Sequence, residues 1–128
     1  MLLTASNVLH PTGQHSPGWV RTRGDRIVGV GGGLPDGAPD QDFPGCVLTP
    51  GFVDMHVHGG AGAAYTSVDV DKLARVAAFH LRHGTTTTMA SLVSASPSDL
   101  ERSVALLADL VEQGVLAGIH LEGPWLSP

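Results

Sequence analysis

The chain has 128 residues, of which 42% are hydrophobic and 15% are charged, so it can build the core of an ordinary domain and is not a disordered chain. Its formal net charge is −5, with only seven lysines and arginines, which argues against a nucleic-acid-binding protein. No stretch is long and apolar enough for a membrane helix, and the first residues lack the features of a signal peptide. We therefore expect a cytoplasmic protein that binds neither nucleic acid nor membrane.

The first 48 residues show the pattern of short strands joined by turns. The predicted strands cover residues 2–9, 18–23 and 26–30. Gly24 and Asp25 suit a two-residue hairpin turn between the last two strands, and the glycines and prolines of residues 31–39 predict a loop. The single cysteine, Cys46, cannot form an internal disulfide, and its place before an apolar strand predicts a buried packing residue.

From residue 46 onward, predicted strands alternate with predicted helices. The strands cover residues 46–57, 85–93 and 115–121, with a break at residues 49–51 as an alternative for the first, and the helices cover residues 69–83 and 97–113. Short loops in the order β-α-β-α-β predict parallel strands joined by right-handed crossovers. The helices carry apolar stripes at helical spacing, formed by Val70, Leu73, Ala74, Ala77 and Leu81 in the first and by Leu100, Val104, Leu107 and Val111 in the second.

Polar residues mark the ends of both predicted helices. Ser67 or Asp69 can cap the start of the first helix, and Ser96 can cap the second. His80 and His83 lie in the last turn of the first helix, where a basic side chain interacts favourably with the helix dipole. We expect this simple electrostatic role for both histidines.

The stretch from Pro50 to Gly60 has the pattern of a strand that ends in a metal site. Side chains alternate along a strand, so Asp54, His56 and His58 are expected to share one face, with apolar residues on the other. Two imidazoles two residues apart can bind one cation, at roughly 2.0–2.1 Å from each nitrogen for zinc. The alternative is an ordinary strand with two incidental histidines.

A second motif, from His120 to Glu122, ends the third strand of this region. Ligands bind at the carboxyl ends of parallel strands, so we predict that His56, His58 and Glu122 meet there and bind a metal ion. A salt bridge or a helix cap is the alternative for Glu122. His120 and Asp54 lie deeper in their strands, so they are expected to support the ligands rather than to bind the metal.

Together the two motifs resemble those of the amidohydrolase superfamily. The ending from Gly118 to Pro128, with its run His-Leu-Glu-Gly-Pro-aromatic-Leu, resembles the N-acetylglucosamine-6-phosphate deacetylase family in particular. The Pro-Gly-Phe-x-Asp run at residues 50–54 and the Gly-Thr-Thr step at residues 84–86 fit the same family. The resemblance covers essentially the whole chain.

This resemblance implies an α/β protein with a (β/α)8 barrel and a small β-sandwich assembled from both chain ends. Residues 1–48 would form the N-terminal part of the sandwich, and residues 49–128 the first β-α-β-α-β portion of the barrel. Because such a barrel needs roughly 250 residues, we expect the chain to be an N-terminal fragment, or the product of an incomplete gene model.

The resemblance also implies metal-dependent hydrolysis of N-acetylglucosamine 6-phosphate to glucosamine 6-phosphate and acetate, in amino-sugar catabolism. Glu122 matches the glutamate that binds the catalytic metal, and His56 and His58 match a pair that binds a second metal in some members. Zinc or iron is favoured, cobalt and manganese are compatible, and one or two ions occupy each site. The general-base aspartate and the phosphate-binding groups are expected downstream of Pro128, so no catalytic residue is assigned here. The complete protein is expected to be a homodimer.

Two other interpretations stay open. The chain can belong to a different amidohydrolase, such as a cyclic-amide hydrolase or a deaminase, which tend to carry a metal-bridging lysine on a later strand. It can also be a non-catalytic fragment, because three barrel strands leave an open sheet edge that invites pairing or aggregation. Under the leading interpretation as well, we expect the isolated 128-residue chain to lack deacetylase activity and to bind metal weakly.

Overall fold

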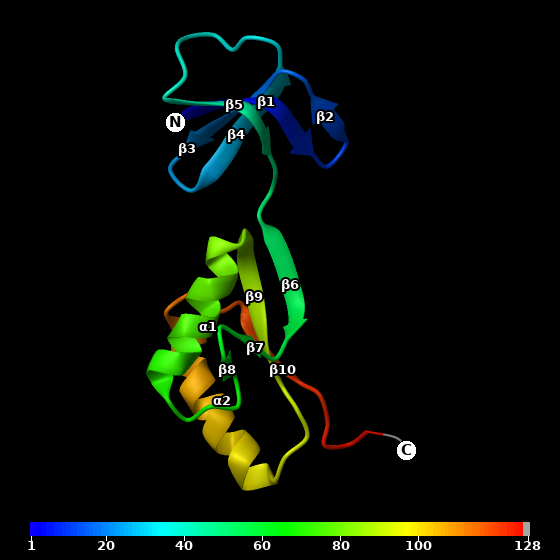
Figure 1. The fold of residues 1–128 in the computed structure, drawn as a ribbon, viewed down its shortest axis with the longest axis vertical. Helices are drawn as coiled ribbons and strands as arrows, with labels where there is room; N and C mark the ends of the chain where they lie inside the picture. Colours follow the sequence, from blue (N-terminus) through cyan, green and yellow to red (C-terminus); the bar gives the residue numbers. More distant parts are fainter. Residues whose placement is uncertain (127–128) are drawn as a thin grey trace. The chain divides into compact units, whose positions relative to one another are not determined.

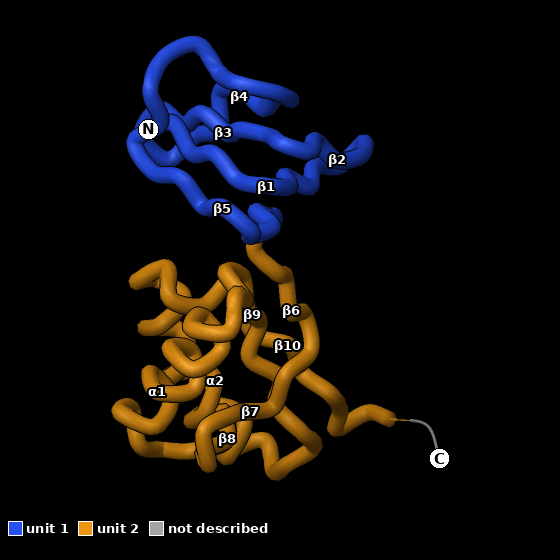
Figure 2. The backbone as a smooth tube through the Cα atoms, turned by 45° about the horizontal axis from the view of Figure 1, so that its top comes forward, with its two compact units in different colours: residues 1–50 blue, residues 51–128 orange. Residues whose placement is uncertain are grey.

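A computed structural model describes residues 1–126, which divide into two compact units, residues 1–50 and residues 51 onward (Figure 2). Ser127 and Pro128, the end of the deacetylase-like run, lie outside the described residues. Within residues 1–126, no helix combines the length and the apolar character needed to cross a membrane.

The first unit is built from strands alone. They are β1 (Leu2–His10), β2 (Gly13–His15), β3 (Gly18–Arg23), β4 (Arg26–Gly32) and β5 (Gln41–Leu48). Strand β1 pairs antiparallel with β2 and β3 and parallel with β5, while β4 pairs antiparallel with β3. The predicted hairpin turn is confirmed, because Gly24 lies between β3 and β4 with φ of 60°, a conformation that glycine adopts without strain.

Two predictions for the first unit are wrong. Strand β5 begins at Gln41, five residues before the predicted start at Cys46, and Cys46 is exposed rather than buried. Within the described residues β5 pairs only with β1, and its residues from Gln41 to Val47 are all exposed. An apolar run in an edge strand therefore does not guarantee burial.

The second unit has a three-stranded sheet covered by two helices. Its elements are β6 (Phe52–Val57), β7 (Gly59–Gly60), β8 (Ala63–Ala64), α1 (Val70–Arg82), β9 (Thr85–Leu92), α2 (Pro97–Glu112) and β10 (Gly118–Leu121). The sheet has the order β10-β9-β6 with parallel neighbours, which confirms the predicted arrangement. Figure 1 shows α1 and α2 on the same side of this sheet, which is not closed within the described residues. The short β7–β8 hairpin, which the sequence did not predict, follows His58.

The core of the second unit lies between the sheet and the helices. Its buried residues are Tyr65, Leu73, Val76, Ala77, Ala90, Leu92, Leu107, Leu110 and Leu116. Three stripe residues, Leu73, Ala77 and Leu107, are therefore confirmed as core. Val70 and Leu81 are instead 51% and 60% exposed, because they lie in the first and last turns of α1, beyond the residues that pack in the core. Ala74 is exposed as well, because the buried face of α1 runs through Leu73, Val76 and Ala77.

The helix starts follow the predicted capping chemistry. Asp69 is the N-cap of α1, and its carboxylate accepts hydrogen bonds from the main-chain nitrogens of Asp71 and Lys72 at 3.1 and 3.3 Å. Ser96 is the N-cap of α2, and its hydroxyl accepts from the main-chain nitrogen of Asp99 at 3.2 Å. These bonds satisfy donors that the first turn of a helix leaves free.

Candidate metal centre

A local irregularity in β6 places the two histidines. Asp54 pairs with Thr88 and Val57 pairs with Ala90, so three steps along β6 match only two along β9. Paired residues of parallel strands share a face, and Thr88 and Ala90 are buried on the side of the helices. Asp54 therefore lies on the helix side, and the prediction that it shares a face with His56 and His58 is wrong. A β-bulge of this kind re-aims the side chains that follow it.

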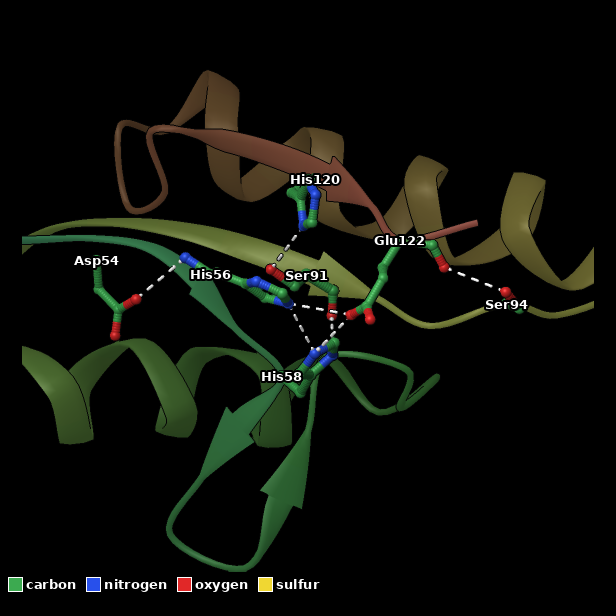
Figure 3. A network of polar contacts seen from close by, with 7 residues as sticks. All are labelled: Asp54, His56, His58, Ser91, Ser94, His120 and Glu122. Carbon is green, nitrogen blue, oxygen red and sulfur yellow. Dashed lines mark hydrogen bonds and ion pairs between the residues drawn. The ribbon is translucent and has the colours of Figure 1, made fainter. Parts of the chain in front are cut away.

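His56, His58 and Glu122 come together at the carboxyl ends of β6 and β10 (Figure 3). Oε2 of Glu122 lies 3.0 Å from Nε2 of His56 and 3.1 Å from Nε2 of His58, and the two nitrogens are 3.1 Å apart. The side chains are 53%, 44% and 40% exposed for His56, His58 and Glu122 in turn, so the group is open to ligands on one side.

The proton arrangement around His58 favours a cation among these three atoms. Nδ1 of His58 lies 3.2 Å from the carbonyl oxygen of Ser91, which can only accept, so Nδ1 carries the proton. In the neutral ring Nε2 is then a bare acceptor, and it faces the carboxylate of Glu122. Nε2 of His58 and the carboxylate oxygen of Glu122 are then two acceptors 3.1 Å apart, which repel each other unless a positive charge lies between them. An added proton or a metal ion supplies that charge.

The spacing of the three atoms also fits a metal ion. Ligand atoms arranged tetrahedrally around zinc at roughly 2.0–2.1 Å stand about 3.3 Å from one another. The three distances of 3.0–3.1 Å are close to that value. Two imidazole nitrogens and one carboxylate oxygen are also a donor set that suits zinc, iron, cobalt and manganese. The residues therefore fit the metal that the sequence predicts.

Ser91 on β9 connects the histidines of the site. Its carbonyl oxygen accepts from His58, and its hydroxyl lies 3.1 Å from Nδ1 of His120. The ring of His120 also packs edge-on against the ring of His56, with 4.8 Å between the ring centroids. His120 thus contacts the ring of His56 from behind. The main-chain nitrogen of His56 donates to Oδ1 of Asp54 at 3.1 Å. That both residues support the ligands stays a prediction.

Two hydrogen bonds hold the main chain of Glu122, one at its nitrogen and one at its carbonyl oxygen. Its main-chain nitrogen donates to the carbonyl oxygen of Leu92 at 2.8 Å, and its own carbonyl oxygen accepts from the hydroxyl of Ser94 at 3.2 Å. Gly123 follows with φ of 94°, and a Cβ atom there would lie 2.0 Å from the Ser94 hydroxyl oxygen. Only glycine fits at this position, which explains the Glu-Gly step of the motif.

Sequence reasoning missed Ser91 and Ser94. Both follow the threonine-rich start of β9 in a mostly apolar run, where a serine carries no spacing signal of its own. The one available signal was position, since both lie near the carboxyl end of a parallel strand next to the two motif strands.

The carboxylate of Glu122 is favoured by its surroundings. The hydrogen bond with His56 is the main cause that lowers the pKa of Glu122, and the charges of His56, His58 and His120 act in the same direction. Desolvation opposes them in part. Glu122 is therefore ionised near neutral pH, which is the form that binds a metal.

Residues 47–128 match the amidohydrolase family, and the match covers more than half of the chain. The chain therefore belongs to this family. Within it, the chain is similar to N-acetylglucosamine-6-phosphate deacetylases, which confirms the resemblance read from the motifs. The Bos taurus deacetylase is 34% identical over 94 residues, which cover 68% of this chain and 23% of that protein. The chain thus spans about a quarter of the length of this relative.

Solved structures give the same result. The crystal structure of N-acetyl-D-glucosamine-6-phosphate deacetylase from Mycobacterium smegmatis matches this chain with a TM-score of 0.94 and 49% sequence identity. The match covers 99% of this chain and 36% of the Mycobacterium smegmatis chain. A mutant of that enzyme, solved in complex with N-acetyl-D-glucosamine-6-phosphate, matches with the same identity and TM-score over 99% of this chain and 33% of that one.

Proposed function

We propose that this chain supplies part of the metal centre of a deacetylase that hydrolyses N-acetylglucosamine 6-phosphate to glucosamine 6-phosphate and acetate, in amino-sugar catabolism. The observation that carries the proposal is the convergence of His56, His58 and Glu122 within 4.8 Å of one another. The similarity to the Mycobacterium smegmatis enzyme supports the choice of substrate, because a mutant of that enzyme was solved with this compound.

In the proposed mechanism these three residues hold one or two divalent ions, with zinc or iron favoured and cobalt or manganese compatible. A bound divalent ion lowers the pKa of water and polarises a carbonyl group. Glu122 contributes a negative charge shared by both imidazoles, since its Oε2 contacts both. Ser91 fixes the proton of His58 on Nδ1 and so leaves Nε2 free to bind. No residue of this chain is proposed to transfer the proton.

The proposed architecture follows from the same resemblance. We propose that residues 1–48 form part of a β-sandwich and that residues 49–128 form the first β-α-β-α-β portion of a (β/α)8 barrel. The parallel order β10-β9-β6, with both helices on one face, supports the second assignment. The metal ligands then lie at the carboxyl ends of the strands, where barrel enzymes carry their active sites.

We also propose that the complete protein is a cytoplasmic homodimer with a small-molecule substrate, as the family resemblance implies. Light scattering after size exclusion tests the dimer, and cell fractionation tests the location.

An acetate-release assay tests the activity. The whole protein that contains this sequence, loaded with zinc or iron, is expected to release acetate from N-acetylglucosamine 6-phosphate. N-acetylglucosamine without the phosphate and N-acetylgalactosamine 6-phosphate serve as control substrates. Turnover of a cyclic amide without turnover of the acetylated sugar phosphates would assign the chain to another branch of the amidohydrolase family.

A further inference from the structure

His80 lies on α1, outside both motifs, yet it contacts the backbone beside a proposed metal ligand. Its Nε2 lies 3.0 Å from the carbonyl oxygen of Gly59, the residue directly after His58. A carbonyl oxygen can only accept, so Nε2 of His80 carries a proton and donates it to this bond. The ring is partly buried, so water competes little for the same oxygen.

The β7–β8 hairpin is shaped for close approach to this part of α1. A Cβ atom on Gly60 would lie 3.0 Å from Nε2 of His80 and 2.9 Å from Cδ1 of Phe79. A Cβ atom on Gly59 would lie 2.2 Å from the carbonyl oxygen of Ala63 across the hairpin. Glycine at both positions therefore lets the hairpin fold back on itself and touch the helix.

A second hydrogen bond, from the residue that follows the β7–β8 hairpin, holds the backbone of His58. The main-chain nitrogen of Tyr65 donates to the carbonyl oxygen of His58 at 2.8 Å. The side chain of Tyr65 is fully buried in the core with residues of α1. The segment from His58 to Tyr65 is thus tied to α1 at its end by Tyr65 and near its start by His80.

We propose that His80 is a positioning residue that holds the backbone of His58, so that Nε2 of His58 stays aimed at the metal. The proposal rests on the proposed metal centre. It differs from the helix-dipole role expected from the sequence, because the bond to Gly59 leaves the helix. His83 gives the contrast, since its Nδ1 lies 2.8 Å from the carbonyl oxygen of Phe79 in the same helix.

Four single variants, made in the whole protein that contains this sequence, test the proposal: His80→Ala, His80→Leu, His80→Gln and the matched control His83→Ala. Cobalt binding is followed by visible absorption. Removing a partner that orients a ligand typically costs 10–100-fold in metal affinity, so His80→Ala and His80→Leu should lose about tenfold. His83→Ala should match the parent chain. The amide of His80→Gln can donate to the same carbonyl oxygen and should recover part of the loss.

A second measurement without metal separates this proposal from the metal centre. Hydrogen exchange of the Tyr65 amide should be faster in His80→Ala and His80→Leu than in His83→Ala, because the hairpin opens more often. Equal exchange and equal cobalt affinity in the His80 and His83 variants would overturn the role of His80. Cobalt binding that does not depend on Glu122 would instead overturn the metal centre. The exchange rate of the Tyr65 amide would then still show whether His80 holds the backbone of His58. If His80→Ala does not fold, His80→Leu, which keeps an apolar side chain, replaces it.

Discussion

The two units of the chain differ most in what covers their strands. In the first unit the buried cluster consists of Ala5, Val8 and Val20, with Leu48 packed against it. In the second unit two helices cover one face of the sheet, and the buried cluster extends from Tyr65 to Leu116. The proposed metal ligands all lie in the second unit. A metal site needs side chains held in fixed positions, and packed strands provide them better than exposed ones.

Within the second unit, the strand that forms the core also supports the site. Ala90 and Leu92 of β9 point into the helical core, while the hydroxyl of Ser91 between them contacts His120 on the side of the site. The alternation of a strand therefore gives one face to stability and the other to chemistry. Changes to the core and changes to the site should thus be separable by experiment.

The largest effect on stability is expected from the core of the second unit. Leu107→Ala should lower the free energy of unfolding by about 3 kcal/mol, since Leu107 is fully buried and its loss leaves a cavity. Both described helices belong to this unit, so denaturation followed by far-ultraviolet circular dichroism reports on it. Val8→Ala, in the first unit, is the control. If it shifts the helical transition as much as Leu107→Ala does, the two units unfold together and the comparison fails.

The next effect is on metal affinity rather than on stability. In the whole protein that contains this sequence, Glu122→Gln removes the charge that both imidazoles contact and should weaken cobalt binding by about 100-fold or more, beyond the usual effect of an indirect partner. Its denaturation curve should stay close to that of the parent chain, because Glu122 is 40% exposed. Glu101→Gln, on the exposed face of α2, is the matched control and should leave the affinity unchanged. Equal affinity in both variants would show that Glu122 is not a ligand.

The sequence predicted the order of elements in the second unit. It also predicted that His56, His58 and Glu122 meet at one edge of the sheet, because these features depend on periodicity and on strand direction. It did not predict the bulge after Asp54, which depends on how β6 pairs with β9. It also missed the roles of Ser91 and His80, whose contacts arise only when distant segments pack together. Cys46 shows the same limit, since the apolar pattern of β5 does not state what covers it.

A smaller effect on stability is expected at alkaline pH. Burial raises the pKa of Tyr65 to about 12, with a smaller contribution from the charge of Asp54, and the hydroxyl has no hydrogen-bond partner within the described residues. The folded pKa lies above the unfolded value near 10, so this contribution to stability is complete below pH 10 and is lost as pH rises through 12. The loss is on the order of 2–3 kcal/mol, because the shift of two pKa units corresponds to about 1.4 kcal/mol for each unit.

The only tyrosine of the chain allows this prediction to be checked directly. Tyrosinate absorption should appear near pH 12 in the folded chain and near pH 10 in denaturant. Tyr65→Phe should remove the part of the alkaline destabilisation that depends on this residue. An absorption change near pH 10 in the folded chain would show that Tyr65 is accessible, and the second unit would then lack the closed core that distinguishes it from the first.

The smallest effect is expected at the start of α2. Ser96→Ala removes the N-cap and should lower the stability of the second unit by about 1 kcal/mol, while Ser96→Thr, which keeps the hydroxyl, should lower it less. The hydrogen bond from Ser96, at 2.6 Å, is the main cause that lowers the pKa of Asp99, with Arg102 acting in the same direction. The ionised Asp99 therefore stabilises the fold above its unfolded pKa, and this contribution is lost as pH falls through the folded pKa. Titration of Asp99 by NMR should show its pKa rising in Ser96→Ala and not in Ser96→Thr. An unchanged pKa together with an unchanged unfolding transition would mean that the buried core alone, without this cap, holds α2 against the sheet.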